Sequence, residues 1–394
     1  MTPKHQINIM IRDAIQQKQS FSFSECKLLH RCICLLLMFY GIAVQIPAKK
    51  VKKYSTFLAV LFHSIWLATV SNEIACFDIA DMTYHCFTLI KYLCSMLSWW
   101  IVHQKKRHLK HLTNALEHLK IELRINESRT ISKWIKFFGY FFSFIIFGPG
   151  IICSIKLIIV NKNPQFFCPY LQNLNIQNGA KVLHFFLLSF FNYCSLGLPY
   201  IIMIFYCFYC AELVRFSKRL TTLRHYGVTE ICGLKEFDTE RYVKKVYGLL
   251  LNTIQKLEST FSSLIFLLLV NSFLEILRIE IVILMYLKGH WKLDIFVHSL
   301  YYSTIAAVSL IFIIVSADKA QDNIDLARDN LRGFSKISSV QRSLIDLRED
   351  IEFWQDVRCI RLTAWGMFKV KRDLFLSILA LYISYIVLIV QFTA

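Results

Sequence analysis

The residues of this chain that could do chemistry are polar side chains set within long apolar runs. In the run 374–392, Ser384, Leu388 and Gln391 are spaced at i, i+4 and i+7, which places them on one face of a helix. A Gln side chain is costly in hydrocarbon unless it meets water or a hydrogen-bonding partner. The spacing therefore indicates that one face of this last helix turns toward water or toward another helix.

A second polar group lies in the apolar run 261–287. Glu275 and Arg278 are i, i+3 neighbours on a helix, and Glu280 follows them. Charged side chains inside a membrane segment usually pair with one another or line water. The sequence leaves two interpretations open: Glu275 and Arg278 neutralise each other, or both belong to the wall of a ligand pocket.

The sequence contains no pattern typical of an enzyme or of a metal site. No cluster of His, Asp and Glu has metal-ligand spacing, and no G-x-S-x-G motif occurs. Cys207 and Cys210 form a C-x-x-C, but no His or second Cys pair lies near it, and Cys in an apolar run behaves as a small hydrophobe. We expect no catalytic activity and no cofactor.

The composition indicates which elements must position these side chains. Hydrophobic residues make up 56% of the chain, the mean hydropathy is +0.46, and Gly (12) and Pro (6) are scarce beside Phe (33). Long unbroken apolar runs of this kind predict an all-α, polytopic membrane protein. Seven runs are long enough to cross about 30 Å of hydrocarbon. They are 55–75, 84–103, 134–160, 181–211, 261–287, 294–317 and 374–392.

The distribution of Lys and Arg predicts the orientation. With seven spans and a cytoplasmic N-terminus, cytoplasmic segments hold 37 of the 45 Lys and Arg, whereas the outer segments hold only Lys162, Lys288 and Lys292. This asymmetry follows the positive-inside rule and puts the C-terminus outside the cell. An eighth span at the ambiguous stretch 28–46 would put one strongly basic segment outside, so we expect this stretch to be interfacial. Basic residues beside anionic lipid headgroups account for the net charge of +18 without any nucleic acid.

Two segments between the spans have amphipathic patterns. Apolar residues recur at helical spacing in 212–260, and charges of both signs are balanced in 318–373. Such segments predict helices that either extend the spans into solvent or pack together below the membrane as a platform between subunits. The sequence leaves these two interpretations open.

The C-terminal residues carry a motif that points to a family. Four residues read T-A-x-G-x-F, and a hydroxyl–Tyr pair in the last run is followed by five apolar residues and then by Gln-Phe. These residues are Thr363, Ala364, Gly366, Phe368, Ser384, Tyr385, Gln391 and Phe392. The pattern resembles the signature of the insect gustatory receptors, which are similar in architecture to insect odorant receptors. Ser384 stands where Thr is usual in that family, which keeps a hydroxyl group at this position.

The resemblance implies a tetrameric, ligand-gated, non-selective cation channel in the plasma membrane of sensory neurons. Each subunit of the homo- or hetero-tetramer contributes its last helix to one central pore, and cytoplasmic helices form an anchor around the axis. The pore residues are then Ser384, Leu388, Gln391 and Phe392, although Gln391 could instead bond to a neighbouring helix. Tyr385, Thr363, Gly366 and Phe368 are assigned to gating or packing.

These assignments divide the chain into four regions. Residues 1–54 are a cytoplasmic N-terminal region with an interfacial helix, and 55–317 are a six-helix ligand-binding region with cytoplasmic helical loops. Residues 318–373 are anchor helices, and 374–394 are the pore-lining last helix.

The resemblance also implies a ligand pocket among the outer halves of the first six spans. Polar and aromatic residues at that depth are the candidates, although each alone could serve ordinary helix packing. They are Tyr84, His85, His184, Phe191, Asn192, Glu275, Arg278, His298 and Tyr302. A set rich in aromatic rings suits a partly apolar small molecule, and it favours a bitter or other aversive tastant over a sugar. A sugar-sensing receptor and an obligate co-receptor subunit remain alternatives.

Two other classes of membrane protein fit the sequence less well. A secondary transporter often has repeated halves with helices broken by Gly or Pro, and the breaks at 148–150 and 197–199 lie in no repeat that can be aligned. A G-protein-coupled receptor would have the opposite orientation in the membrane.

Overall fold

The structure is a computed structural model of the chain. It describes residues 49–75, 82–123, 197–225, 236–287, 293–338 and 361–393, together with a few residues between 37 and 44 and at 125, 140, 144, 147–148 and 189. Its helices are α2 (Lys49–Ala75), α3 (Met82–Glu122), α7 (Leu198–His225), α9 (Glu236–Leu287), α10 (Leu293–Ser338) and α12 (Arg372–Thr393). Two short strands, β1 (Thr363–Ala364) and β2 (Phe368–Lys369), form an antiparallel hairpin just before α12.

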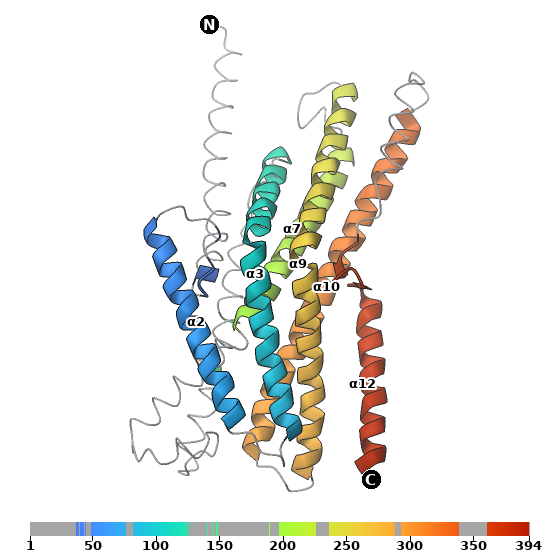
Figure 1. Cartoon of the computed structure of the whole chain (residues 1–394). Helices are drawn as coiled ribbons and strands as arrows, with labels where there is room; N and C mark the ends of the chain where they lie inside the picture. Colours follow the sequence, from blue (N-terminus) through green and yellow to red (C-terminus); the bar gives the residue numbers. More distant parts are fainter. Residues whose placement is uncertain are drawn as a thin grey trace.

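The described helices stand side by side as a bundle. Figure 1 shows α3, α7, α9 and α10 in the centre, with α2 on one side and α12 on the other. The most extensive packing joins α3 to α9, and α10 to both α7 and α9. Among the described helices, four therefore form the centre of the fold and two lie at its edges.

Several helices continue well beyond the predicted spans. At 1.5 Å per residue, the 52 residues of α9 are about 78 Å long, more than twice the thickness of the hydrocarbon. The helix α10 likewise continues from the predicted span 294–317 to Ser338. In the part of the chain that the structure describes, the amphipathic segments are therefore helical, and they continue the spanning helices α9 and α10.

The predicted membrane segments fall on helices wherever the structure describes them. Four described helices are long and apolar enough to cross a membrane, at Lys53–Ala75, His85–Glu122, Leu198–Thr222 and Ser299–Leu331. The runs 261–287 and 374–392 are helical within α9 and α12. The run 134–160 and the first half of 181–211 lie outside the described residues, apart from single positions. The chain is an all-α, polytopic membrane protein, with the small hairpin as its one departure among the described residues.

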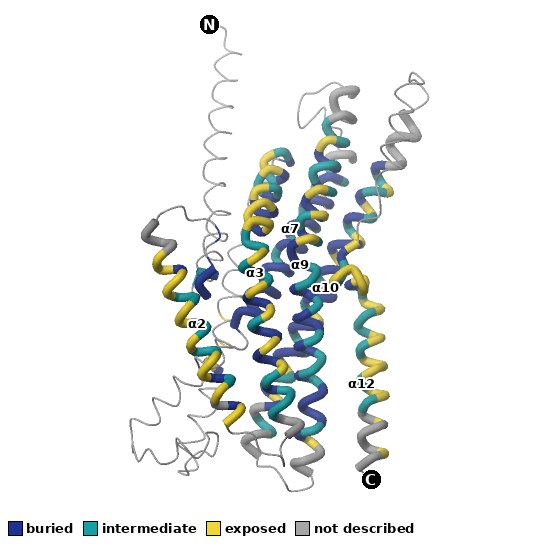
Figure 2. The backbone as a smooth tube through the Cα atoms, viewed as in Figure 1, coloured by how far each residue is buried: buried dark blue, intermediate teal, exposed yellow. Residues whose placement is uncertain are grey.

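Burial separates the centre of the bundle from its edges. Side chains of α7 are buried almost all round, whereas α2 and α12 are largely exposed (Figure 2). Large apolar side chains on α12, including Leu376, Leu381 and Val387, are about half exposed or more. Lipid or a second protein surface must cover such a face.

A tight contact joins the residues before α2 to the bundle. Gly41 has a φ of +74°, and a Cβ atom added there would lie 2.4 Å from the backbone nitrogen of Ala59. The hydroxyl of Ser55 donates to the Gly41 carbonyl at 2.6 Å, and the Trp99 indole donates to the Tyr40 carbonyl at 2.7 Å. Only glycine fits both the backbone angle and the space at this position.

We predict that Gly41→Ala destabilises the protein by at least about 1–2 kcal/mol, because alanine is strained at positive φ and its Cβ meets the backbone of α2. The midpoint of thermal unfolding of the detergent-purified protein measures the effect. Gly248→Ala is the matched control, since Gly248 is inside α9 with nothing within 4 Å of an added Cβ. That change should be neutral or stabilising by about 0.5–1 kcal/mol.

Candidate functional site

Three ionic side chains meet in the interior of the bundle. Glu275 of α9 lies 3.2 Å from the Nζ atom of Lys91 on α3 and 2.8 Å from the Nη2 atom of Arg278 on α9. All three residues are buried, with 7% or less of their surface exposed. Charges can remain in such a place because each is paired, and removing one partner leaves an uncompensated charge.

An aromatic ring from α10 completes this cluster. The Lys91 Nζ atom lies 4.0 Å from the centre of the Tyr302 ring, and the Arg278 guanidinium carbon lies 5.5 Å from it. The Nη1 group of Arg278 donates to the Ser299 hydroxyl of α10 at 3.4 Å. Cation–π attraction and hydrogen bonds thus join α3, α9 and α10 at one depth. We call Lys91, Glu275, Arg278, Ser299 and Tyr302 the ionic cluster.

A polar pair connects α2 to the same region. The Nδ1 atom of His85 on α3 lies 2.8 Å from the Glu73 carboxylate of α2. The charged side chains of this region therefore pair with one another, and the Tyr302 ring lies against the two cations of the ionic cluster.

The T-A-x-G-x-F motif forms the hairpin that precedes α12. In its turn, Met367 N–H donates to the Ala364 carbonyl at 3.1 Å, and both Trp365 and Gly366 have positive φ angles of 52° and 70°. The Gly366 N–H donates to the Thr363 hydroxyl at 3.1 Å. The glycine of the motif supplies the left-handed backbone that this turn requires.

The hairpin is bound to α9 by hydrogen bonds and by one aromatic contact. The Glu258 carboxylate accepts the Thr363 N–H at 2.9 Å and also accepts the Thr363 hydroxyl. The Trp365 N–H donates to the Ser262 carbonyl at 3.0 Å, and the Trp365 ring packs edge-on against Phe266 at 5.1 Å. A positive φ is unusual for a bulky residue, and these contacts offset its strain. Burial raises the pKa of the Glu258 carboxyl, and the bonds from Thr363 oppose that rise.

The hairpin is also bound to α10. The Leu362 N–H donates to the Gln321 side-chain carbonyl at 3.2 Å, and Arg372, the first residue of α12, lies 2.7 Å from the Asp318 carboxylate. The side chains of Leu362, Ala364 and Val370 are buried beneath the hairpin. The segment 362–370, which we call the hairpin from here on, is therefore fixed between α9 and α10.

The helix that follows makes fewer contacts. Leu374, Phe375 and Ile378 of α12 pack against the core, and beyond them most described positions of α12 are exposed. The buried Glu280 of α9 faces the Tyr382 hydroxyl, but no hydrogen bond of standard geometry reaches either carboxylate oxygen from the described residues. Ser384 and Gln391 are exposed, and the Ser384 hydroxyl donates to the Ala380 carbonyl of its own helix at 2.9 Å.

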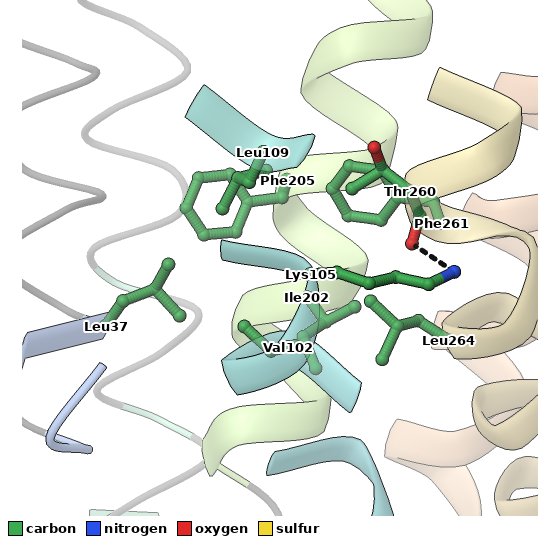
Figure 3. Close-up of a pocket in the computed structure, with 9 residues that line it drawn as sticks. All are labelled: Leu37, Val102, Lys105, Leu109, Ile202, Phe205, Thr260, Phe261 and Leu264. Atoms are coloured by element: carbon green, nitrogen blue, oxygen red, sulfur yellow. Dashed lines mark hydrogen bonds between the residues drawn. The ribbon is translucent and has the colours of Figure 1, made fainter. Parts of the chain in front are cut away.

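A narrow, mainly apolar crevice lies between α3, α7 and α9. Figure 3 shows its nine lining residues: Leu37, Val102, Lys105, Leu109, Ile202, Phe205, Thr260, Phe261 and Leu264. The Lys105 amine at its edge is used by α9, because it donates to the Ser259 carbonyl at 2.6 Å and the Ser263 hydroxyl at 3.0 Å. Among the described residues, no three His, Cys, Asp or Glu side chains could jointly hold a metal ion.

Comparison with known proteins decides the family. The sequence model of the family described as 7tm Chemosensory receptor matches residues 53–394. The chain belongs to this chemosensory receptor family. The resemblance inferred from the C-terminal motif is confirmed at this level, and the family is not an enzyme family.

Solved structures show that this chemosensory receptor shares its fold with an insect olfactory receptor. The structure of olfactory receptor OR5 from Machilis hrabei is similar with a TM-score of 0.68 at 14% sequence identity, covering 94% of this chain and 99% of OR5. The structure of OR5 in complex with eugenol is similar with a TM-score of 0.59 at the same identity and coverage. A search of curated proteins finds no match.

The structure describes only part of the predicted ligand set of this receptor. His85, Glu275, Arg278 and Tyr302 lie in or beside the ionic cluster, so the mutual neutralisation of Glu275 and Arg278 occurs, with Lys91 as a further partner. Tyr84 and His298 lie on α3 and α10, but their side chains are outside the described set, as are those of Leu388 and Phe392 on α12. His184, Phe191 and Asn192 lie outside the described residues.

Sequence reasoning missed the residues that hold the hairpin. Thr363, Gly366 and Phe368 come together there, whereas Tyr385 lies on α12 away from them. Glu258 and Gln321 were not singled out, because a polar residue on an amphipathic helix gives no sign of a distant partner. Lys91 had a weak sign, since it is a lone cation in the apolar run 84–103.

We predict that Glu275→Gln destabilises the receptor by about 3–5 kcal/mol, because it leaves Lys91 and Arg278 buried without their anion. The thermal midpoint of the purified protein and its yield at the cell surface measure the loss. Glu122→Gln is the matched control, since it breaks an ion pair with Lys245, whose side chain is 60% exposed, and should cost about 1 kcal/mol or less. Equal effects of the two changes would contradict the role given to the cluster.

We predict that Gly366→Ala loosens the hairpin by about 1–2 kcal/mol, whereas Gly366→Asn costs less, because Asn tolerates positive φ. An added Cβ meets nothing within 4 Å, so the backbone angle alone decides the result. The loosening is measured by hydrogen exchange of the whole protein, followed after proteolysis in the fragment that contains the Trp365 amide. Equal protection in all three proteins would show that the turn does not depend on this angle.

Proposed function

We propose that this chain is a gustatory receptor that acts as a ligand-gated, non-selective cation channel of four subunits. The observation that carries the proposal is the exposure of α12, an apolar helix with the exposed Gln391 near its end, most of whose described positions are not covered by the rest of the chain. Four such helices around one axis would cover these faces and present rings of Ser384 and Gln391 to a passing ion. The five-residue spacing from Tyr385 to Gln391-Phe392 supports the gustatory branch of the family.

The ligand we propose is a bitter or other aversive small molecule. The charges of the ionic cluster pair with one another, and two aromatic rings of α10, Tyr301 and Tyr302, lie 5.5 Å apart at this level. A pocket of this kind suits a partly apolar ligand better than a sugar. The structure of OR5 in complex with eugenol supports a small-molecule ligand for a receptor of this fold.

The proposed orientation puts the N-terminus in the cytoplasm and the end of α12 outside the cell. The excess of Lys and Arg in the segments assigned to the cytoplasm supports it. The hairpin then lies near the cytoplasmic face of the plasma membrane of a sensory neuron, and the ionic cluster lies toward the outer face. The extension of α10 to Ser338 supplies the first part of the anchor proposed for 318–373, and the first half of α9 supplies the part that precedes the fifth span.

Expression of the chain in a cell without endogenous chemoreceptors, followed by a screen of tastants for cation current, tests the proposal. We predict that Gln391→Ala changes the unitary conductance or the gating while surface expression stays the same, because the amide would hydrate ions near the outer mouth. Gln255→Ala on the exposed face of α9 is the matched control and should leave the current unchanged.

Three results would contradict parts of this proposal. An unchanged current in Gln391→Ala would assign this amide to helix packing. A current that needs a gradient of a coupled ion would indicate a carrier. A tag at the C-terminus that is accessible only from the cytoplasm would reverse the orientation.

A further inference from the structure

We propose that the hairpin is the rigid link through which α9 and α10 set the position of α12, and that Glu258 is its positioning residue. This inference rests on the proposed function of the chain as a channel with α12 at the pore. It assigns the coupling between ligand and pore to residues outside both sites.

The first support is the completeness of the bonding at Glu258. One carboxylate oxygen accepts the backbone N–H of Thr363, and the other accepts its hydroxyl. The Thr363 hydroxyl also accepts the N–H of Gly366, so one side chain ties the turn of the hairpin to α9. Hydrogen bonds to an ionised acceptor are about twice as strong as neutral ones. This joint is therefore the strongest polar attachment of the hairpin.

The second support is that several helices meet at this joint. Lys105 brings α3 to the turn of α9 that follows Glu258, through its bonds to the Ser259 carbonyl and the Ser263 hydroxyl. Gln321 of α10 accepts the Leu362 N–H on the opposite side of the hairpin. A displacement of α3, α9 or α10 therefore moves the hairpin, residues 362–370.

The third support is the contrast between the two ends of α12. At its start, Arg372 is paired with Asp318, and the first turns pack on the core. Farther along, the exposed large side chains Leu379, Leu381 and Ile383 lie on a helix whose partner surface is not this chain's own core. Most contacts of α12 with the rest of the chain are in its first turns, with Tyr382 near Glu280 of α9 part-way along. The helix is about 33 Å long, so a small rotation at the hairpin becomes a larger displacement near Gln391.

The fourth support is that one continuous helix carries both the ionic cluster and the joint. Glu258 and Glu275 are 17 residues apart on α9, about 25 Å along its axis. The helix α10 likewise carries Tyr302 near one end and Gln321 farther along. A ligand that moves α9 against α10 at the ionic cluster thus moves the two walls that hold the hairpin.

A set of single variants tests the role of Glu258 while keeping the fold. Thr363→Val removes the hydroxyl at constant shape, and Glu258→Gln removes the charge. Each should raise the ligand concentration for half-maximal current by about tenfold, the factor that one hydrogen bond to a charged group is worth. Thr363→Ser should behave as the wild type. Unitary conductance should stay constant in all of them, because none touches the pore.

Matched controls separate coupling from general loss of stability. Thr304→Val removes an exposed hydroxyl that bonds only to its own helix, and Glu122→Gln breaks a surface ion pair between α3 and α9. Neither should change the dose–response curve. Surface expression, measured by biotinylation, corrects the maximal current of every variant.

A reversible cross-link tests the rigidity of the link. The hydroxyl oxygens of Ser262 and Thr363 lie 3.4 Å apart, which is close enough for a disulfide after the double change Ser262→Cys and Thr363→Cys. The reduced double variant should show the right-shifted response of Thr363→Val. Oxidation should form the cross-link, seen by mass spectrometry of the joined peptides, and restore the wild-type response.

The outcomes distinguish this inference from the proposed function. A wild-type chain that gives no cation current with any tastant overturns the proposed function and with it the coupling. A wild-type current with unshifted responses in Thr363→Val and Glu258→Gln overturns the link alone. A cross-link that silences the current, with recovery on reduction, shows that the hairpin must leave α9 for the pore to open, and it overturns rigidity.

Discussion

The Glu275 carboxylate is the charge on which the arrangement of the central helices depends. It lies between a lysine from α3 and an arginine from its own helix, and both cations lie against the ring of one tyrosine on α10. In an apolar bundle none of these charges can stay without the others, so the three helices have one relative register that satisfies them all. Apolar side chains alone would allow many sliding arrangements of near-equal energy, and the ionic cluster selects among them.

The same principle operates in a different form at the hairpin. Here the groups that need partners are backbone N–H groups of an irregular turn, and they find a carboxylate, a carbonyl and a side-chain amide on two helices. The hairpin is small, yet it buries Leu362, Ala364 and Val370 almost completely. It therefore forms part of the core of the protein, although its two strands have only two residues each. The direction in which α12 begins is therefore fixed by the hairpin, whereas the exposed faces of α12 must be covered by lipid or by another chain.

Sequence reasoning predicted the elements that follow from average hydropathy. The predicted runs 55–75 and 374–392 correspond closely to α2 and α12, because a span must be apolar over its whole length whatever its neighbours are. Helical periodicity also predicted helices in the segments where α9 and α10 extend past the predicted spans. The hairpin was not predicted as a structure, since two-residue strands have no period, although its residues carried the family motif. Glu258, Lys91 and Gln321 were not predicted as partners, because their pairing depends on which helices become neighbours in the folded chain.

The unbroken course of α9 has a consequence for how this sequence can change over time. The helix has no proline to interrupt it. It contributes residues both to the ionic cluster and to the joint with the hairpin, and each residue turns about 100° around its axis from the one before. Inserting or deleting one residue between Glu258 and Glu275 would turn one site by about 100° relative to the other and make it point at the wrong neighbour. Substitutions between the two glutamates can be many, provided the buried positions keep their polar or apolar character. The number of residues between Glu258 and Glu275 must stay the same. We therefore expect differences in length among relatives to occur in the connections between helices.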